Sequence, residues 1–286
     1  MATFFNQASI SFGGYVTNSN ITVGEVLDTL SVTKSVISSG YDQNGGTVYA
    51  VSLVNSGTVS ISGITVSDDL GAYTEGTLTL VPFDYVIGSV KLYINGVLIG
   101  APAVSAGPPL ILSGISLPAG ASALLLYEVN ANAYAPLASG STITNTVTVT
   151  AEAPCVEGPI TASATVTVSD YTVLSIAKSV CPEVISGCDE VTYTFVIQNG
   201  GNTEIVATDD LIVTDTFSPA LTNVTVTLNG NTLTEGVDYT YDPATGVFTT
   251  LPGAITVPAA TFVRDPVTGI FTTTPGVAAL TVSGTI

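Results

Sequence analysis

The chain has 286 residues, enough for two domains of common size, and 22 acidic residues against 4 basic ones give it a net charge of −18. Nucleic acid and anionic membrane surfaces are unsuitable partners, because both are bound through Lys and Arg side chains. With no His and three Cys, the common metal sites and nucleophile–His pairs are largely excluded, and we expect no cofactor.

The composition favours strands along the whole chain. Thr, Val and Ile are abundant, Gly and Pro recur at short intervals, and no stretch shows a convincing helical period of apolar residues. The sequence therefore predicts an all-β protein, built of two tandem Ig-like β-sandwiches with an N-terminal donor-strand extension.

The first predicted strand covers residues 4–12 and reads FFNQASISF. Its alternate side chains form one row, as in a half-buried strand: Phe4, Asn6, Ala8, Ile10 and Phe12. Asn6 is unexpected in this apolar row, because an amide needs hydrogen-bond partners when it is buried. We expect the residues that follow, up to residue 29, to be a linker.

An internal repeat organises the rest of the chain. The segment LSVTKSV at 30–36 returns as LSIAKSV at 174–180, and TVYAVSLVNSG at 47–57 returns as VTYTFVIQNGG at 191–201. The segment ITVSDDL at 64–70 then matches LIVTDTF after a short insertion. The repeat predicts two copies of one domain. The expected division is 1–29 for the donor strand and linker, 30–172 for domain 1, and 173–286 for domain 2.

Turn signals separate the predicted strands. Asn95-Gly96 and Asn229-Gly230 predict two-residue hairpin turns. DPATGVFTTLPG at 242–253 recurs as DPVTGIFTTTPG at 265–276, which we interpret as a local duplication that enlarges one edge of domain 2. A ligand-binding role for the duplicated turns is the less favoured alternative.

Ionisable and amide side chains share the inward rows of the predicted strands. Lys34 lies in the apolar row of its strand, and Lys178 occupies the repeated position. Asp68, Asp215 and Asn145 stand in apolar rows of other strands. Each domain thus directs charged groups inward, where an unpaired charge is very costly.

This combination of residues has a chemical use. Burial shifts a Lys amine toward its neutral, nucleophilic form, and a carboxyl group nearby can carry protons. The amine can attack the carbonyl carbon of an Asn side chain and release ammonia, which forms an isopeptide bond once per site. The alternatives are a buried Lys–Asp ion pair beside a hydrogen-bonded Asn, or lysines that extend outward to solvent.

The quoted motifs, together with LPAGAS and ITNTVTVT, resemble the bacterial surface repeat known as domain of unknown function eleven, over nearly the whole chain. That resemblance implies Ig-like sandwiches in a secreted or surface protein. The inward residues also resemble those of isopeptide-forming domains in Gram-positive pilins and adhesins. By this likeness Lys34, Asp68 and Asn145 would form the cross-link of domain 1, with Asp68 and Asp215 as proton shuttles.

Domain 2 is expected to lack its final strand. Residues 117–129 of domain 1 align with residues 274–286, after which domain 1 continues into STITNTVTVT and the sequence given stops. The pattern of the missing strand recurs at residues 4–12, where Asn6 takes the place of Asn145. Asn6 would then be the cross-linking partner of Lys178.

Insertion of residues 4–12 into domain 2 of another subunit would be donor-strand complementation. The contact is head-to-tail, so its repetition gives an open filament unless it closes into a ring. The alternative is that the segment folds back onto its own domain 2, since residues 13–29 span up to about 55 Å when extended.

The remaining candidate groups are weaker. Asp209, Asp210 and Asp215 crowd one segment, but their spacing matches no calcium loop with defined ligand positions, so no metal is expected. Cys181 and Cys188 flank a short loop and could form a disulfide. Cys155 is left to pair between subunits or to stay free.

The sequence favours a structural subunit of a bacterial extracellular fibre, a pilus or a spore appendage, whose partner is another copy of itself. No membrane-spanning segment and no secretory signal peptide is visible, which fits a fibre assembled inside a sporulating mother cell and freed by lysis, with the cell or spore surface as its expected location. The alternative is a monomeric adhesin or surface-layer stalk module with a truncated domain 2 and an unknown surface ligand. An enzyme has little support.

Overall fold

The computed structural model describes residues 2–26, 29–38, 40–43, 45–152, 156, 158–186 and 189–286. The chain forms two compact units: domain 1, residues 1–135 and 142–167, and domain 2, residues 136–141 and 168–286. The division after residue 167 lies five residues before the boundary expected from the repeat.

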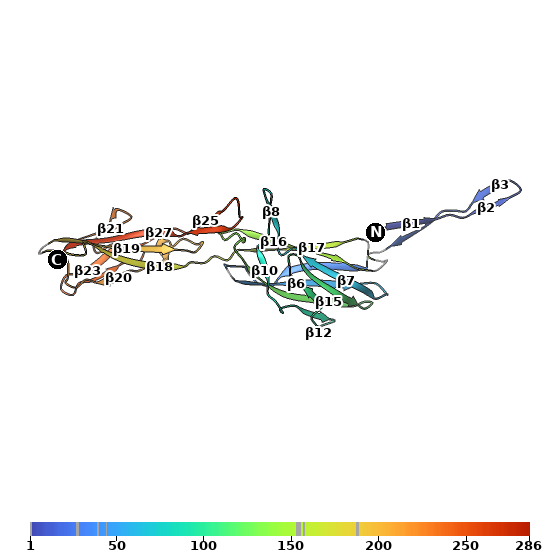
Figure 1. Cartoon of the computed structure of the whole chain (residues 1–286), viewed down its shortest axis with the longest axis horizontal. Coiled ribbons are helices and arrows are strands. Elements are labelled where there is room, and N and C mark those ends of the chain that lie inside the picture. Colours follow the sequence, from blue (N-terminus) through green and yellow to red (C-terminus); the bar gives the residue numbers. More distant parts are fainter. Residues whose placement is uncertain are drawn as a thin grey trace. The chain divides into compact units, whose positions relative to one another are not determined.

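Domain 1 consists of two antiparallel sheets (Figure 1). The first sheet has the order β12 (Val97–Gly100), β11 (Lys91–Ile94), β15 (Ser122–Ala131), β6 (Gly46–Asn55), β5 (Leu30–Val36), and β10 (Phe83–Tyr85) also pairs with β15. The second sheet has the order β13 (Ala103–Ser105), β14 (Leu110–Leu117), β7 (Ile61–Asp68), β16 (Thr142–Thr150), β17 (Ile160–Thr167). A separate hairpin joins β8 (Tyr73–Glu75) to β9 (Leu78–Leu80).

The core of domain 1 follows from the alternation of its strands. Along β16, Ile143, Val147 and Val149 are buried, whereas the Thr residues between them are exposed or half-buried. The same alternation buries Leu125 of β15 in the facing sheet. One face of each sheet is therefore apolar, and the two faces pack together as a sandwich.

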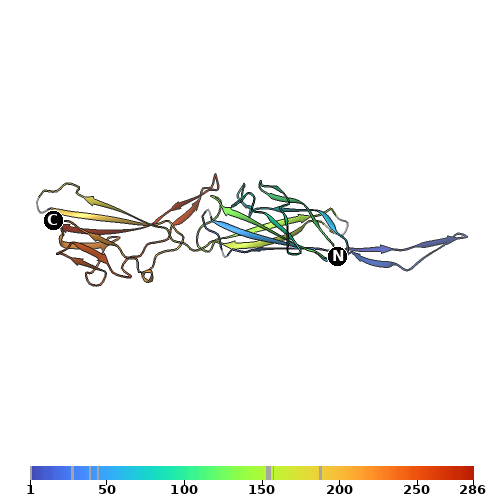
Figure 2. The same ribbon diagram turned by 90° about the horizontal axis from the view of Figure 1, so that it is seen from below.

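Domain 2 also has two sheets (Figures 1 and 2). The first has the order β22 (Asn231–Thr232), β21 (Thr222–Leu228), β27 (Gly276–Thr285), β19 (Glu190–Asn199), β18 (Leu174–Cys181). The second has the order β23 (Tyr239–Asp242), β24 (Val247–Thr250), β20 (Thr214–Thr216). Outside these sheets lie a hairpin of β25 (Thr261–Arg264) and β26 (Phe271–Thr274), and the 3₁₀ helix η1 (Ala207–Asp209). Buried Phe195, Phe217, Phe248 and Leu280 contribute to the core. The prediction of an all-β protein built of sandwich sheets is confirmed, and the two compact units are consistent with the predicted tandem arrangement.

The two domains share one strand order, with two differences. Apart from β10, which has no counterpart among the described residues of domain 2, the first sheets match strand for strand, from β12 and β22 at one edge to β5 and β18 at the other. In the second sheets, β13, β14 and β7 correspond to β23, β24 and β20. The described residues of domain 2 contain no counterpart of β16 and β17, so β20 pairs on one side only, with β24.

The N-terminal residues form a hairpin rather than one strand and a linker. β1 (Ala2–Asn6) pairs with β4 (Thr22–Val26), and β2 (Ser9–Phe12) pairs with β3 (Tyr15–Asn18). Gly13 and Gly14, with φ of 58° and 90°, form the turn between β2 and β3. The expectation of a plain linker at residues 13–29 was therefore wrong for β3 and β4. Figure 2 shows this hairpin, in blue, as a narrow two-stranded ribbon.

The predicted Asn-Gly turns are confirmed. Asn95 and Gly96 connect β11 to β12 with φ of 49° and 79°, and Asn229 and Gly230 connect β21 to β22 with φ of 50° and 81°. Two successive positive φ values are the mark of the hairpin turn that Asn-Gly favours. In the duplicated segment, the first copy supplies β24 and the second supplies β26.

Candidate cross-linking sites

Lys34 of β5 and Asp68 of β7 meet across the sandwich of domain 1. The Lys34 Nζ atom lies 2.6 Å from Oδ2 of Asp68, and the two side chains are 0% and 1% exposed. The amine also lies over the ring of Tyr49, 4.6 Å from its centroid. The alternative in which Lys34 extends outward to solvent is therefore wrong.

Burial shifts the protonation equilibrium of the Lys34 amine. Desolvation lowers the pKa of the Lys34 amine below its ordinary value of 10.5, although the Asp68 carboxylate opposes this shift. The Asp68 carboxylate accepts a short hydrogen bond from the Tyr127 hydroxyl and one of 2.8 Å from the N–H of Leu70. The site thus holds an amine displaced toward its neutral form beside a carboxyl group fixed on both oxygens.

Asn145 completes the group in domain 1. It lies on β16, two residues before Val147, which pairs with Asp68, so its side chain enters the same core, where it is 0% exposed. Its Oδ1 atom accepts a hydrogen bond of 3.3 Å from Gly71, but among the described residues its buried Nδ2 has no partner. A buried polar group without a partner costs about 1–3 kcal/mol, and loss of Nδ2 as ammonia would remove this cost.

The Tyr49 hydroxyl interacts with Asn145 in the same core. Burial raises the pKa of the Tyr49 hydroxyl, whereas interaction with Asn145 lowers it. Among the described residues, the Tyr49 hydroxyl and the Asn145 Nδ2 atom are both buried without a hydrogen-bond partner. Lys34, Asp68 and Asn145 are thus all buried in the core of domain 1, and the cross-link between Lys34 and Asn145 stays a prediction.

The equivalent pair in domain 2 has the same partners in a different environment. Lys178 of β18 forms an ion pair with Asp215 of β20 and lies over the ring of Tyr193, 4.7 Å from the centroid. The side chains of Lys178 and Asp215 are 39% and 19% exposed. The open side of domain 2 leaves this pair in contact with solvent.

Apolar side chains beside Lys178 share this exposure. Leu174 is 42% exposed, whereas Leu30 at the equivalent position of domain 1 is 4% exposed. Ile176 is 56% exposed, although its partner Ile197 on β19 faces the core and is 3% exposed. In domain 1, β16 and β17 both contact β5, and in domain 2 nothing comparable covers β18 among the described residues. Domain 2 therefore has exposed apolar side chains beside its Lys–Asp pair.

The predicted donor residues lie in the N-terminal hairpin. Phe4, Ile10 and Phe12 are 59%, 66% and 87% exposed, and Asn6 and Ala8 are also exposed. Within the single chain, Asn6 is the cross-strand partner of Thr22 on β4, and Lys178 forms an ion pair with Asp215. The predicted contact between Asn6 and Lys178 stays a prediction.

Sequence reasoning missed the two tyrosines of the domain 1 site. Tyr127 holds the acid, and Tyr49 stacks on Tyr127 with ring centroids 5.9 Å apart. The repeat alignment had matched Tyr49 with Tyr193 without giving either a role. Tyr127 pairs with Tyr49, whereas Val282 pairs with Tyr193, so domain 2 has no counterpart of the Tyr127 hydroxyl.

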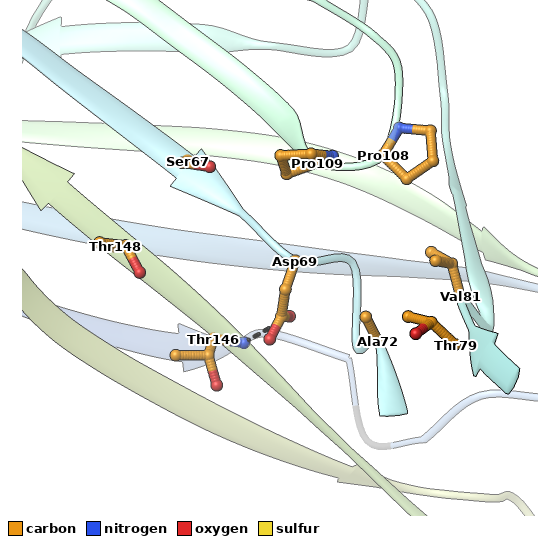
Figure 3. Close-up of a pocket in the computed structure, with 9 residues that line it drawn as sticks. All are labelled: Ser67, Asp69, Ala72, Thr79, Val81, Pro108, Pro109, Thr146 and Thr148. Carbon is orange, nitrogen blue, oxygen red and sulfur yellow. Dashed lines mark hydrogen bonds between the residues drawn. The ribbon is translucent and has the colours of Figure 1, made fainter. Parts of the chain in front are cut away.

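A hollow of about 400 Å³ lies on the other face of the β7–β16 sheet (Figure 3). Its lining includes Asp69, whose carboxylate accepts hydrogen bonds of 2.9 Å from the N–H groups of Thr146 and Gly71. Burial raises the pKa of Asp69, and these two bonds oppose the rise. Asp69 therefore ties the end of β7 to β16, which helps to place Asn145.

The weaker candidates form no site within the described part of the chain. No three His, Cys, Asp or Glu side chains gather there to hold a metal ion, and the Asp209 carboxylate accepts the N–H of Val206. Cys181 is exposed at the end of β18, while Cys155 and Cys188 lie outside the described residues, and with them the predicted disulfide. The same part of the chain contains no helix with the length and apolar character needed to cross a membrane.

No protein-family model and no curated protein matches the chain. Among solved structures it is similar to a variant of BcpA, the major pilin subunit of Bacillus cereus, at 12% identity and a TM-score of 0.39, over 95% of this chain and 70% of that chain. Domains D2 and D3 of the major pilin SpaD from Corynebacterium diphtheriae match at 12% identity and a TM-score of 0.36, over 85% of this chain and 88% of that chain. The collagen-binding domain of a Staphylococcus aureus adhesin matches at 8% identity and a TM-score of 0.32, over 48% and 96%. Similarities of this strength assign no family to the chain.

Proposed function

We propose that this protein is a structural subunit of a bacterial extracellular fibre, a pilus or a spore appendage, that polymerises head to tail. One observation carries the proposal. Domain 2 repeats the strand order of domain 1, but among the described residues no strand corresponds to β16 or β17 beside β20, and the N-terminal segment has the residue pattern of β16. A sheet edge with exposed apolar neighbours and a strand of the matching residue pattern, both in one chain, support the proposal.

In this proposal, residues 4–12 of one subunit insert into domain 2 of the next. The free edge of β20 offers unpaired backbone groups, which an added strand can bond. The apolar row of the donor would cover Leu174 and Ile176, which are exposed in the single chain. Asn6 would approach Lys178 as Asn145 approaches Lys34.

The same chemistry would then act in both domains. The neutral Nζ amine attacks the Asn side-chain carbonyl carbon, a new C–N bond forms, and the bond from that carbon to Nδ2 breaks. The Asp carboxyl group takes a proton from the attacking amine and gives one to the leaving nitrogen, which departs as ammonia. Lys34 and Asn145 would form a bond within the subunit, and Lys178 and Asn6 one between subunits. Each site reacts once, so the protein is not a turnover enzyme.

A denaturing gel tests the proposal. The wild-type protein should give a ladder of oligomers that resists heat and detergent, and Asn6→Ala should reduce it to a monomer band. Asn145→Ala is the matched control, because it should keep the ladder but lose the internal bond, so that its chain no longer shows, relative to its own sequence mass, the deficit of one ammonia that this bond gives the wild type. A wild-type chain that runs only as monomer would instead indicate the adhesin or stalk module.

A further inference from the structure

We propose that the inserted element is the whole hairpin β1–β4, so that two strands, not one, complete domain 2 of the neighbouring subunit. This inference rests on the proposed function and specifies its donor. In domain 1 the strands missing from domain 2 are themselves a hairpin, β16 and β17, paired from Thr142 and Thr167 to Val149 and Ile160. The N-terminal hairpin has the same antiparallel arrangement.

The place of the two hairpins in the chain is also the same. β17 ends at Thr167, and the Lys strand β18 of the next domain begins at Leu174. β4 ends at Val26, and the Lys strand β5 begins at Leu30. Each hairpin thus directly precedes a sandwich. In a filament, every sandwich would be completed by the hairpin that leads into the sandwich after it.

The cross-strand pairs agree with this equivalence. Asn145 pairs with Ala164, and Asn6 pairs with Thr22, so each reactive amide faces a small residue on the return strand. Two positions before Asn145, Ile143 pairs with Val166. Two positions before Asn6, the N-terminal hairpin pairs a large residue with a small one.

Phe4 pairs with Gly24, and its ring lies directly over this glycine. A Cβ atom at Gly24 would lie 2.2 Å from Cζ of Phe4, so a side chain there would displace the ring from this position. In this pair, one large ring and a residue without a side chain take the place of two medium-sized side chains. It therefore fills a space like that of Ile143 and Val166, as a hairpin seated in a sandwich requires.

A single added strand would leave domain 2 partly open. In domain 1, β17 contacts β5 in addition to β16, and Val166 of β17 is 2% exposed. The counterpart of β5 in domain 2 is β18, which carries exposed Leu174 and Ile176. Covering these side chains as Leu30 is covered therefore needs a return strand, and β3 and β4 are in position to supply it.

The length of the chain indicates that the acceptor is a second subunit. Only three residues separate Val26 from Leu30, and they span at most about 14 Å. From Leu30, β5 runs about 20 Å toward Tyr41, whose N–H donates to the carbonyl of Thr167, the last residue of domain 1. The base of the hairpin is thus held at the end of domain 1 away from the exit of the chain. This favours domain 2 of another copy over its own.

Hydrogen exchange on the assembled polymer tests the inference. If the hairpin inserts whole, the amides of residues 15–26 should be protected to a degree comparable with those of residues 4–12. Protection of residues 4–12 alone would overturn the hairpin but keep the proposed function. Protection of neither segment would overturn both.

A pair of variants gives a second test. Gly24 has an ordinary negative φ, so contact with Phe4 is the main obstacle to a side chain there. Gly24→Val should lower the yield of polymer about ten-fold through overpacking, and Phe4→Ile with Gly24→Val, which copies Ile143 and Val166, should restore it. If Gly24→Val assembles like the wild type, the return strand is not part of the contact. If Gly24→Val and the double variant lose polymer yield equally, the Phe4–Gly24 pair is not equivalent to the Ile143–Val166 pair.

Discussion

The Nζ atom of Lys34 lies 2.6 Å from Oδ2 of Asp68 with both side chains buried, whereas the equivalent ion pair of Lys178 and Asp215 is open to solvent. The residue types are the same, and the difference lies in the strands that cover them. Burial favours the neutral amine that the cross-link requires. We therefore expect the proposed reaction in domain 2 to begin only after a donor has excluded water from Lys178. In the free subunit, the Lys178 amine would not attack an Asn side chain.

The first prediction concerns the buried ion pair. In an Asn145→Ala background, which cannot form the internal bond, Asp68→Ala should lower the free energy of unfolding of domain 1 by about 3–5 kcal/mol, because it leaves the Lys34 charge buried without a partner. Chemical denaturation followed by tyrosine fluorescence measures the change. Adding Lys34→Met should recover most of the loss. A loss that persists in this variant would show that Asp68 acts mainly through its bonds to Tyr127 and Leu70.

The second prediction concerns pH. Because the pKa of Lys34 is lower in the folded state than its ordinary 10.5, the unfolded chain binds more protons between these two values. The free energy of unfolding of the Asn145→Ala variant should therefore rise with pH in this window. The rise should end near pH 10, where unfolded tyrosines lose protons that buried Tyr127 retains.

Denaturant titrations at several pH values measure this dependence. The control is the Lys34→Met, Asn145→Ala variant, in which the increase toward pH 10 should disappear while the fall above it remains. An increase of equal size in both variants would assign the effect to other groups.

The third prediction separates folding from assembly. Ile176 is 56% exposed, so Ile176→Thr should change the free energy of unfolding of the unassembled chain by no more than about 0.5 kcal/mol. It should nevertheless reduce the ladder on a denaturing gel, because the donor covers this side chain. Val32→Thr, at the equivalent position of domain 1, is the control: it should destabilise domain 1 and leave the ladder in place. Normal assembly of Ile176→Thr would count against insertion at β18.

The fourth prediction concerns the duplicated turn in domain 2. Gly246 has a φ of 74°, and a Cβ atom there would lie 2.1 Å from the carbonyl oxygen of Phe217. Gly246→Ala should therefore destabilise domain 2 by more than the roughly 1–2 kcal/mol of a left-handed alanine. Gly230→Ala is the matched control, since Gly230 has a φ of 81° with open space around it. Thermal unfolding compares the two, and equal losses would contradict the predicted clash.

Much of the domain 1 site could be predicted because it depends on local alternation. A strand has a period of two, so the inward direction of Lys34, Asp68 and Asn145 follows from the apolar residues on either side of each. The two tyrosines could not be assigned in this way. Tyr127 meets Asp68 only because β15 and β7 belong to facing sheets, and no local pattern specifies which residues meet across a sandwich.

The N-terminal segment shows the same limit. Residues 4–12 alternate regularly and were predicted as a strand, whereas β3 and β4 carry mixed polar and apolar residues that alone indicate no partner. Their pairing with β2 and β1 depends on the turn at Gly13 and Gly14 and on cross-strand contacts such as Phe4 over Gly24. A hairpin is defined by such pairs, so one strand read by itself could not reveal the other.

The sequence alone determined the all-β class, the repeated domain and the inward position of the reactive residues, because strand periodicity and repetition are written in neighbouring residues. Only the tertiary structure decided that Lys34 is buried while Lys178 is open, since burial depends on strands distant in the chain. The sequence predicted one missing strand, whereas only the assembled sheets showed that β16 and β17 both lack a counterpart among the described residues of domain 2 and that the N-terminal residues pair as a hairpin.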